Sequence, residues 1–282
     1  MSASTIEEQR RELYEIAEAI ASTWEARRAY VEGVSAPVRE WLLRELAPRP
    51  GETVLELAAG VGDTGFEAAA TLGERGRLIS TDFSPAMVEA ARRRGSELGV
   101  ENVEYRVIDA ERVELDGDSV DGVLCRFGYM LMADQAAALA ETRRVLRPGG
   151  RLALAVWGAQ ERNPFFVTIA ISLVQHGHLP MPEPPGPPVF SMASAERTTA
   201  LLEGAGFAEV RTEEVAVQFE TPDVDEYLSV IADTAGPLGL ALRGLSDSER
   251  AAVKADVEDV FPRFAAESGY EIPGVALCAV AS

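Results

Sequence analysis

Five short apolar runs alternate with amphipathic segments between residues 50 and 158, and each change of period predicts a change from strand to helix. Strands joined by helices in this way form right-handed crossovers, which favour a parallel sheet with ligands at the carboxyl ends of its strands. The alternation returns after residue 193, with a strand over 210–219 and an apolar last strand over 274–281. The first five runs begin at Thr53, Arg77, Val103, Val120 and Arg151.

Helical periodicity dominates two other segments. Residues 5–47 give helical patterns that Pro48-Arg49-Pro50-Gly51 stops, and residues 222–269 are mostly helical. The whole pattern predicts an α/β fold with a doubly wound, seven-stranded, mostly parallel sheet. Its expected parts are N-terminal helices at 1–49, a core at 50–158, an insertion at 159–192, and the C-terminal part of the sheet at 193–282 with a helical insertion at 222–269.

The insertion at 159–192 interrupts the alternation. It joins an apolar helical stretch to the proline-rich segment 179–190, where prolines exclude regular helix or central strand. An insertion that follows the fifth strand is expected to form a lid over a substrate entrance. The alternative is a surface excursion that only packs against the core. Under the first hypothesis a small hydrophobic or aromatic molecule would contact Phe165, Phe166, Ile169 and Leu173.

A glycine turn follows the first strand. Gly60 and Gly62 let the backbone come close to a ligand, and Glu56 is a carboxylate near the strand end that needs a polar partner. The string from Gly60 to Gly65 also matches the dinucleotide fingerprint G-x-G-x-x-G. Asp63 argues against a dinucleotide, because a carboxylate in the first helical turn would repel phosphates. A ligand with hydroxyls, an amino group and a net positive charge fits better.

Two more acids follow the next two strands. Asp82 ends the second strand about 20 residues past the glycine turn, where a carboxylate is expected to bind a ribose diol. Asp109 ends the third strand and is placed for the exocyclic amine of an adenine. A nicotinamide enzyme would use Asp82 but would leave Glu56 and Asp109 unexplained.

In this order the features resemble those of class I S-adenosylmethionine-dependent methyltransferases, in the small-molecule branch that includes the ubiquinone and menaquinone C-methyltransferases. Ala58 departs from the family pattern, since many members carry glycine there. A finer resemblance to a small-molecule subgroup rests on Arg126-Phe127-Gly128-Tyr129-Met130 and Asn163-Pro164-Phe165. The main resemblance rests on Glu56-x-Ala58-x-Gly60-x-Gly62, Asp82-Phe83-Ser84, Asp109-Ala110, Asp121 and Leu146-Arg147-Pro148-Gly149-Gly150.

The resemblance implies a Rossmann-like methyltransferase fold, in which the last strand runs antiparallel between the fifth and sixth. It implies S-adenosylmethionine as the cofactor, bound by residues 50–158, and methyl transfer to oxygen or carbon of a small acceptor. The expected cofactor-binding residues are Trp24, Glu56, Ala58, Gly60, Gly62, Asp82, Phe83, Met87, Asp109, Ala110 and Arg126.

The candidate catalytic residues are His176, His178, Arg126 and Tyr129. A hydroxyl acceptor must lose a proton, and a histidine is a suitable base. Two histidines beside a glycine also suit a simple helix cap. Arg126 either binds a substrate anion or forms a structural bridge, and Trp24 either closes the site or belongs to the core.

Composition limits the classes of partner that the protein is expected to bind. The net charge of −20 leaves no basic face for nucleic acid. The two cysteines show no metal spacing and fit a reducing cytoplasm, and no signal peptide or membrane span of ~20 residues is expected. We expect a cytoplasmic enzyme with a small-molecule acceptor and no metal. A homodimer, an NAD(P)-dependent oxidoreductase and a non-catalytic S-adenosylmethionine-binding protein stay open.

Overall fold

The computed structural model describes residues 3–182 and 188–282, and a single mixed sheet lies at its centre. The strand order is β3-β2-β1-β4-β5-β8-β6, and β7 pairs with β8. Strands β1 to β5 pair in parallel, whereas β8 is antiparallel to both β5 and β6. The strands are β1 (Thr53–Glu56), β2 (Arg77–Asp82), β3 (Val103–Val107), β4 (Val120–Arg126), β5 (Leu146–Trp157), β6 (Arg211–Thr221), β7 (Ala265–Ala266) and β8 (Gly269–Ala281).

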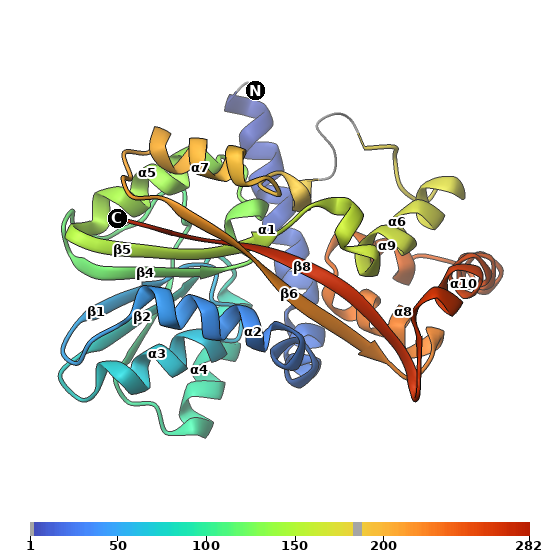
Figure 1. Ribbon diagram of the computed structural model, residues 1–282, viewed down its shortest axis with the longest axis horizontal. Coiled ribbons are helices and arrows are strands. Elements are labelled where there is room, and N and C mark those ends of the chain that lie inside the picture. Colours follow the sequence, from blue (N-terminus) through green and yellow to red (C-terminus); the bar gives the residue numbers. More distant parts are fainter. Residues whose placement is uncertain (1–2, 183–187) are drawn as a thin grey trace.

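Helices form two layers on the sheet and a separate group beyond it. In Figure 1, α5 and α7 lie on one face, and α2, α3 and α4 lie on the other. The long strands β6 and β8 continue past the rest of the sheet towards α6, α8, α9 and α10. The helices are α1 (Ala3–Ala26), α2 (Arg28–Leu46), α3 (Asp63–Leu72), α4 (Pro85–Leu98), α5 (Gln135–Val145), α6 (Pro164–Gln175), α7 (Ala195–Gly204), α8 (Val224–Thr234), α9 (Pro237–Arg243) and α10 (Asp247–Val260).

This architecture confirms the predicted fold and the antiparallel last strand between the fifth and sixth. Seven strands form the continuous order of the sheet, as predicted, and the two-residue β7 is an addition that pairs only with β8. The helical insertion also ends before residue 269, because β7 and the start of β8 form a short hairpin in which Ala266 pairs with Gly269. The local pattern missed this hairpin because Gly269, with φ of +89°, reverses the chain within a segment of helical composition.

The first half of the predicted lid is anchored to the core. Phe165, Ile169 and Leu173 of α6 are buried, and the Phe165 ring stacks on Phe219 with centroids 3.9 Å apart. The Tyr227 hydroxyl of α8 donates a hydrogen bond to the carbonyl of Phe165 (2.7 Å). These residues therefore face inward, as the alternative hypothesis for α6 holds. The proline-rich residues 183–187 lie outside the described residues, so lid motion stays a prediction.

The strand order reverses between β1 and β4, which lie side by side in parallel. In open α/β sheets this reversal leaves a crevice at the carboxyl ends of the strands, and ligands bind there. Glu56, Asp82 and Arg126 are the last residues of β1, β2 and β4. The fold therefore brings residues of the predicted cofactor site to one edge of the sheet.

Candidate cofactor and acceptor site

The predicted glycine turn after β1 has a left-handed backbone conformation at three positions. Ala58, Gly60 and Gly62 have φ of +51°, +55° and +89°, a region that glycine adopts freely and alanine adopts with strain. A Cβ on Gly62 would also lie 2.6 Å from the Phe66 ring. The turn is thus a tightly packed loop that leads into α3. Its left-handed conformation strains the backbone of Ala58.

Asp82 closes this turn from the neighbouring strand. Its Oδ2 accepts the N–H of Gly60 (2.9 Å), and its Oδ1 accepts the N–H of Ser84 (3.0 Å). Burial raises the pKa of Asp82 to about 6, which leaves the group ionised at neutral pH. A carboxylate has about four lone-pair sites. The backbone donors do not use all of these sites, so acceptor capacity remains for a ribose hydroxyl.

Glu56 lies beneath α3 rather than on the open side of the turn. It is 3% exposed, its Oε1 accepts the N–H of Gly65 (2.9 Å), and a Cβ on Gly65 would lie 2.1 Å from its Oε2. Burial raises its pKa to about 8, although Arg126 acts in the opposite direction. The carboxyl group therefore joins β1 to α3. This placement does not support the direct cofactor contact predicted for Glu56.

Helix α1 covers the expected position of an adenosine. A cleft of about 320 Å³ lies between α1 and the ends of β2 and β3, and Phe83 and Asp109 line it. Trp24 lies over the glycine turn, with its Nε1 3.6 Å from the place of a Cβ on Gly60. Met87 packs against Ile20 and Ala21 of α1. Phe83, Asp109, Met87 and the glycine turn thus lie along α1, and Ala110 is buried in the main core.

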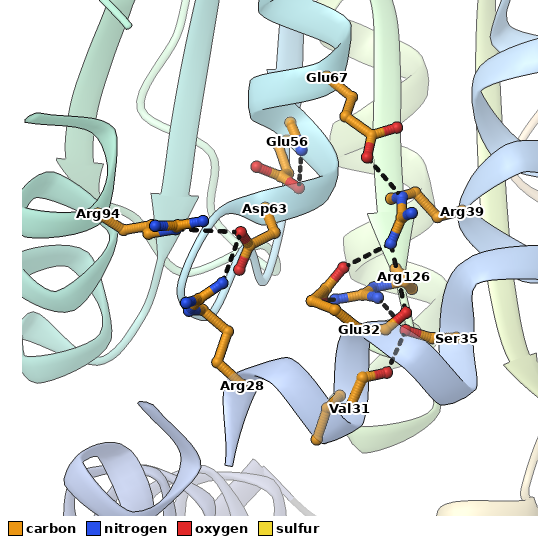
Figure 2. A network of polar contacts seen from close by, with 11 residues as sticks. Arg28, Val31, Glu32, Ser35, Arg39, Glu56, Asp63, Glu67, Arg94 and Arg126 are labelled. Atoms are coloured by element: carbon orange, nitrogen blue, oxygen red, sulfur yellow. Dashed lines mark hydrogen bonds and ion pairs between the residues drawn. The ribbon is translucent and has the colours of Figure 1, made fainter. Parts of the chain in front are cut away.

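An ion-pair network joins α2 to the end of β4 and to α3 (Figure 2). Arg126 pairs with Glu32 and donates to the Ser35 hydroxyl, both on α2. Arg39 contacts the other Glu32 oxygen (2.9 Å) and Glu67 of α3 (2.7 Å). Both terminal nitrogens of Arg126 are therefore engaged. The contacts favour the structural bridge over the binding of a substrate anion.

Asp63 begins α3, as predicted, and forms a separate group of ion pairs beside this network. Its Oδ1 lies 3.4 Å from Arg28 of α2 and 3.3 Å from Arg94 of α4. Burial raises the pKa of Asp63 most, and repulsion from Glu32 raises it further, while the two arginines lower it. Figure 2 shows Asp63 between the two guanidinium groups. The carboxylate occupies the helix start where a pyrophosphate would otherwise bind.

Aromatic rings gather on the other side of the crevice. Phe127 follows β4 with φ of +59°, and its ring stacks on Trp157 at the end of β5, with centroids 4.2 Å apart. The Phe166 ring of α6 lies 5.0 Å from Trp157. We call Phe127, Trp157 and Phe166 the aromatic wall. Strain in a bulky residue such as Phe127 is costly and is found most often at functional sites.

Tyr129 does not reach this crevice. It is fully buried, and its hydroxyl forms a hydrogen bond with the Thr142 hydroxyl of α5. This burial does not support the predicted contact between Tyr129 and the acceptor, because the side chain has no surface exposed to a ligand.

A family model matches the part of the chain that carries these features. It is the model of the ubiE/COQ5 methyltransferase family, and it matches residues 9–174. The chain belongs to this family. The matched segment includes the glycine turn, Asp82, Asp109, the aromatic wall and α1 from residue 9 onwards.

Two curated relatives illustrate the range of this family. The chain is 34% identical over 146 residues to the ubiquinone/menaquinone biosynthesis C-methyltransferase UbiE of Acidiphilium cryptum, covering 51% of this chain and 58% of the relative. It is 32% identical over 173 residues to the aklanonic acid methyltransferase DauC of Streptomyces sp. strain C5, covering 58% of this chain and 78% of the relative. In several other relatives the match spans about half of the relative's length or less.

A solved structure shares the fold. The crystal structure of a SAM-dependent methyltransferase from Aquifex aeolicus superposes with a TM-score of 0.51 at 24% identity, covering 65% of this chain and 87% of that chain.

His176 contacts α10, and His178 lies beside it. His176 follows α6, and its Nε2 lies 2.9 Å from Oδ2 of Asp256 in α10, the same oxygen that accepts from the Ser172 hydroxyl. The ring of His178 lies 6.3 Å from that of His176. These contacts fasten α6 to α10. A general-base role for either histidine stays a prediction without a supporting contact.

Within residues 3–182 and 188–282, no three His, Cys, Asp or Glu side chains are grouped in a way that could hold a metal ion. In the same segments, none of the helices combines the length and the apolar character that crossing a bilayer requires.

Sequence analysis did not identify several residues of the site. Arg10, Tyr14 and Glu18 of α1 contact the region around Asp109, Phe83 and Ser84. Their spacing of four residues places them on one helix face, which was the available signal. Glu32 and Trp157 had no local signal, because their partners are distant in the chain.

Proposed function

We propose that the protein transfers the methyl group of S-adenosylmethionine to oxygen or carbon of a small hydrophobic or aromatic acceptor. The observation that carries this proposal is the pair of carboxylates at consecutive strand ends, Asp82 across the glycine turn and Asp109 at the cleft. Membership in a methyltransferase family supports the same reaction class.

The residues present suit the two ends of an adenosine. Asp82 has lone pairs free for the ribose hydroxyls, and Asp109 borders a cleft large enough for a planar base. The glycine turn lets backbone approach the ligand without a side-chain clash. S-adenosylmethionine would supply a methyl group already activated by its sulfonium, so the protein's task is mainly to orient the acceptor and to exclude water.

Asp63 is the specific argument against a nicotinamide dinucleotide. Its carboxylate stands at the start of α3, where the helix dipole and free N–H groups would otherwise bind a pyrophosphate. Arg28 and Arg94 hold this carboxylate at the helix start, so a pyrophosphate would have to displace a paired carboxylate from the position that it needs. S-adenosylmethionine carries no phosphate, so it does not encounter the conflict.

The aromatic wall supports a flat apolar acceptor. Trp157 is nearly buried, and Phe127 and Phe166 are half-buried around it, so the wall has little exposed polar surface. Aromatic side chains favour other rings by stacking or edge contacts. The names of two relatives refer to ubiquinone/menaquinone biosynthesis and to aklanonic acid. We propose an acceptor of comparable ring character that is methylated on oxygen or on carbon.

The remaining proposals concern partners and location. The net charge of −20 supports a protein that works without nucleic acid. We propose that it acts in the cytoplasm on a small molecule, and a homodimer is compatible with this function.

Transfer of an isotope-labelled methyl group tests the proposed function. The protein is incubated with labelled S-adenosylmethionine and a cell extract, and products are analysed by mass spectrometry. We expect a small apolar product that carries one labelled methyl group and is absent with an Asp82→Ala variant. Binding of S-adenosylhomocysteine without any labelled product across an acceptor panel would instead favour a non-catalytic binding protein, and preferential NADH binding would favour an oxidoreductase.

A further inference from the structure

One face of α1 packs against the part of the core that carries the predicted cofactor residues Asp109 and Phe83. Arg10, Tyr14 and Glu18 are spaced by four residues and therefore project from the same face. Glu18 accepts the N–H of Ala86 (3.1 Å) and pairs with the Ser84 hydroxyl, at the start of α4. This contact fixes α1 beside the residues that directly follow Asp82.

Apolar side chains from both α1 and the core line the cleft between α1 and the strand ends. Tyr14 of α1 and Phe83 of the core meet edge to face, with ring centroids 6.0 Å apart and planes at 84°. Val107 adds an apolar surface that is 52% exposed, and Asp109 supplies a polar edge. Two rings beside one acid suit a planar heterocycle that carries an amino group at its edge.

Arg10 holds the acid at this edge. Its Nε lies 3.1 Å from Oδ2 of Asp109, and its terminal nitrogen pairs with Glu111, whose side chain is 4% exposed. The other Asp109 oxygen accepts the N–H of Glu111 (2.9 Å). The N–H of Glu111 thus fixes one Asp109 oxygen, and Arg10 forms an ion pair with the other. Arg10 also offsets the repulsion between the neighbouring carboxylates of Asp109 and Glu111.

We propose that α1 forms one half of the adenine-binding site. Tyr14, in edge contact with Phe83, extends the apolar surface that the adenine ring contacts, and Arg10 is a positioning residue that aims the Asp109 carboxylate at the exocyclic amine. The proposal rests on the proposed function, because it takes S-adenosylmethionine as the ligand. It goes further in assigning recognition of the base to a helix outside the sheet core.

Calorimetric titration with S-adenosylhomocysteine tests the role of Tyr14. Tyr14→Ala should weaken binding by about tenfold, the range of an aromatic contact, and Tyr14→Phe should bind within about twofold of the wild type. Glu12→Ala and Glu15→Ala, on exposed positions of the same helix, are matched controls and should bind normally. Circular dichroism of the free variants checks that α1 is formed.

The positioning role of Arg10 needs a readout that a packing role would not change. The readout is the ratio of affinities for S-adenosylhomocysteine and for its deaminated analogue, in which a carbonyl replaces the adenine amine. The wild type should prefer the amine by about tenfold or more, since the carbonyl would leave Asp109 without a donor. Arg10→Ala should reduce this preference to below about threefold, and Arg10→Lys should restore part of it.

The outcomes separate this proposal from the proposed function. Normal binding by Tyr14→Ala and unchanged discrimination by Arg10→Ala, together with weak binding by Asp82→Ala, would overturn the role of α1 and leave the function standing. No binding by the wild type would overturn both. Hydrogen exchange of the wild type gives an independent check: α1 amides should exchange more slowly with S-adenosylhomocysteine present, and an unchanged rate would contradict the proposal.

Discussion

Gly128 lies where the turn after β1 meets the end of β4, and there is no room for a side chain on it. A Cβ at this position would lie 2.6 Å from the Cβ of Ala58 and 2.6 Å from Sγ of Cys125. Neither neighbour can rotate away, because Ala58 is a single methyl group and Cys125 is fully buried. The approach of these two loops fixes the crevice that the proposed function uses.

Gly128→Ala should therefore destabilise the protein by about 2 kcal/mol, the usual cost of overpacking. Gly33→Ala is the matched control: Gly33 lies in α2 with open space around its Cβ position, so alanine should stabilise by up to about 1 kcal/mol. Urea unfolding measures both. Equal free energies of unfolding for the two variants would show that the loops move apart at little cost.

Single residues also show how far the sequence could lead. Asp82 was predictable because a carboxylate at the end of a parallel strand has one expected location. The cofactor contact of Glu56 stays a prediction, because the direction of this side chain depends on how closely Gly65 of α3 packs against it. The burial of Tyr129 against α5 was not predictable either, because it results from long-range packing that the local pattern does not determine.

At the scale of elements, the Glu32–Arg126 pair fastens α2 to β4. Both side chains are largely buried, so removing one leaves the other charge poorly solvated. Arg126→Met and Glu32→Gln should each lower the free energy of unfolding by about 2 kcal/mol, and the double variant should lose less than the sum. A double-mutant cycle by urea unfolding measures the coupling. Strict additivity would indicate that the pair does not bridge the elements.

The contact between α6 and α10 predicts what the histidines do. His176→Ala should cost less than about 1 kcal/mol of stability, since the pair with Asp256 is exposed, and His178→Ala should cost no more. Both should keep nearly full turnover and the wild-type pH profile, measured with the acceptor found by methyl labelling. A loss above about a hundredfold in kcat from either change, with cofactor affinity intact, would establish general-base catalysis instead.

Element order was the most predictable level of the structure. Alternating periods identified the strands of the core, and the family pattern supplied the antiparallel last strand. The placement of α1 was not predictable, because the contact of Arg10 with Asp109 joins residues far apart in the chain. The hairpin of β7 and β8 was also missed, since two paired residues carry no periodicity.

At the scale of the whole molecule, Glu56 should make stability depend on pH. Its folded pKa of about 8 lies above the ordinary value of 4.5, because burial penalises the charged form. Between these values the folded state binds more protons than the unfolded state, so stability falls as pH rises. We expect a loss of about 2 kcal/mol between pH 6.5 and 8.5, approaching 1.4 kcal/mol per unit at most.

Glu56→Gln is the control for this effect, since an amide has no proton to lose. Urea unfolding of both proteins across that range should give a falling curve for the wild type and a flatter one for the variant. Parallel curves would show that Glu56 is already ionised in the folded protein at neutral pH.

The central claim is that the crevice beside β1 holds S-adenosylmethionine through Asp82, and calorimetric titration with S-adenosylhomocysteine tests it most directly. The wild type should bind it in preference to NADH, and Asp82→Ala should bind more weakly by roughly 1.5 to 3 kcal/mol. Wild-type affinity should also fall as the pH drops below about 6, where Asp82 takes up a proton and loses acceptor capacity, whereas Asp82→Asn should lack this dependence. Unchanged affinity in Asp82→Ala, or tighter binding of NADH by the wild type, would contradict the account.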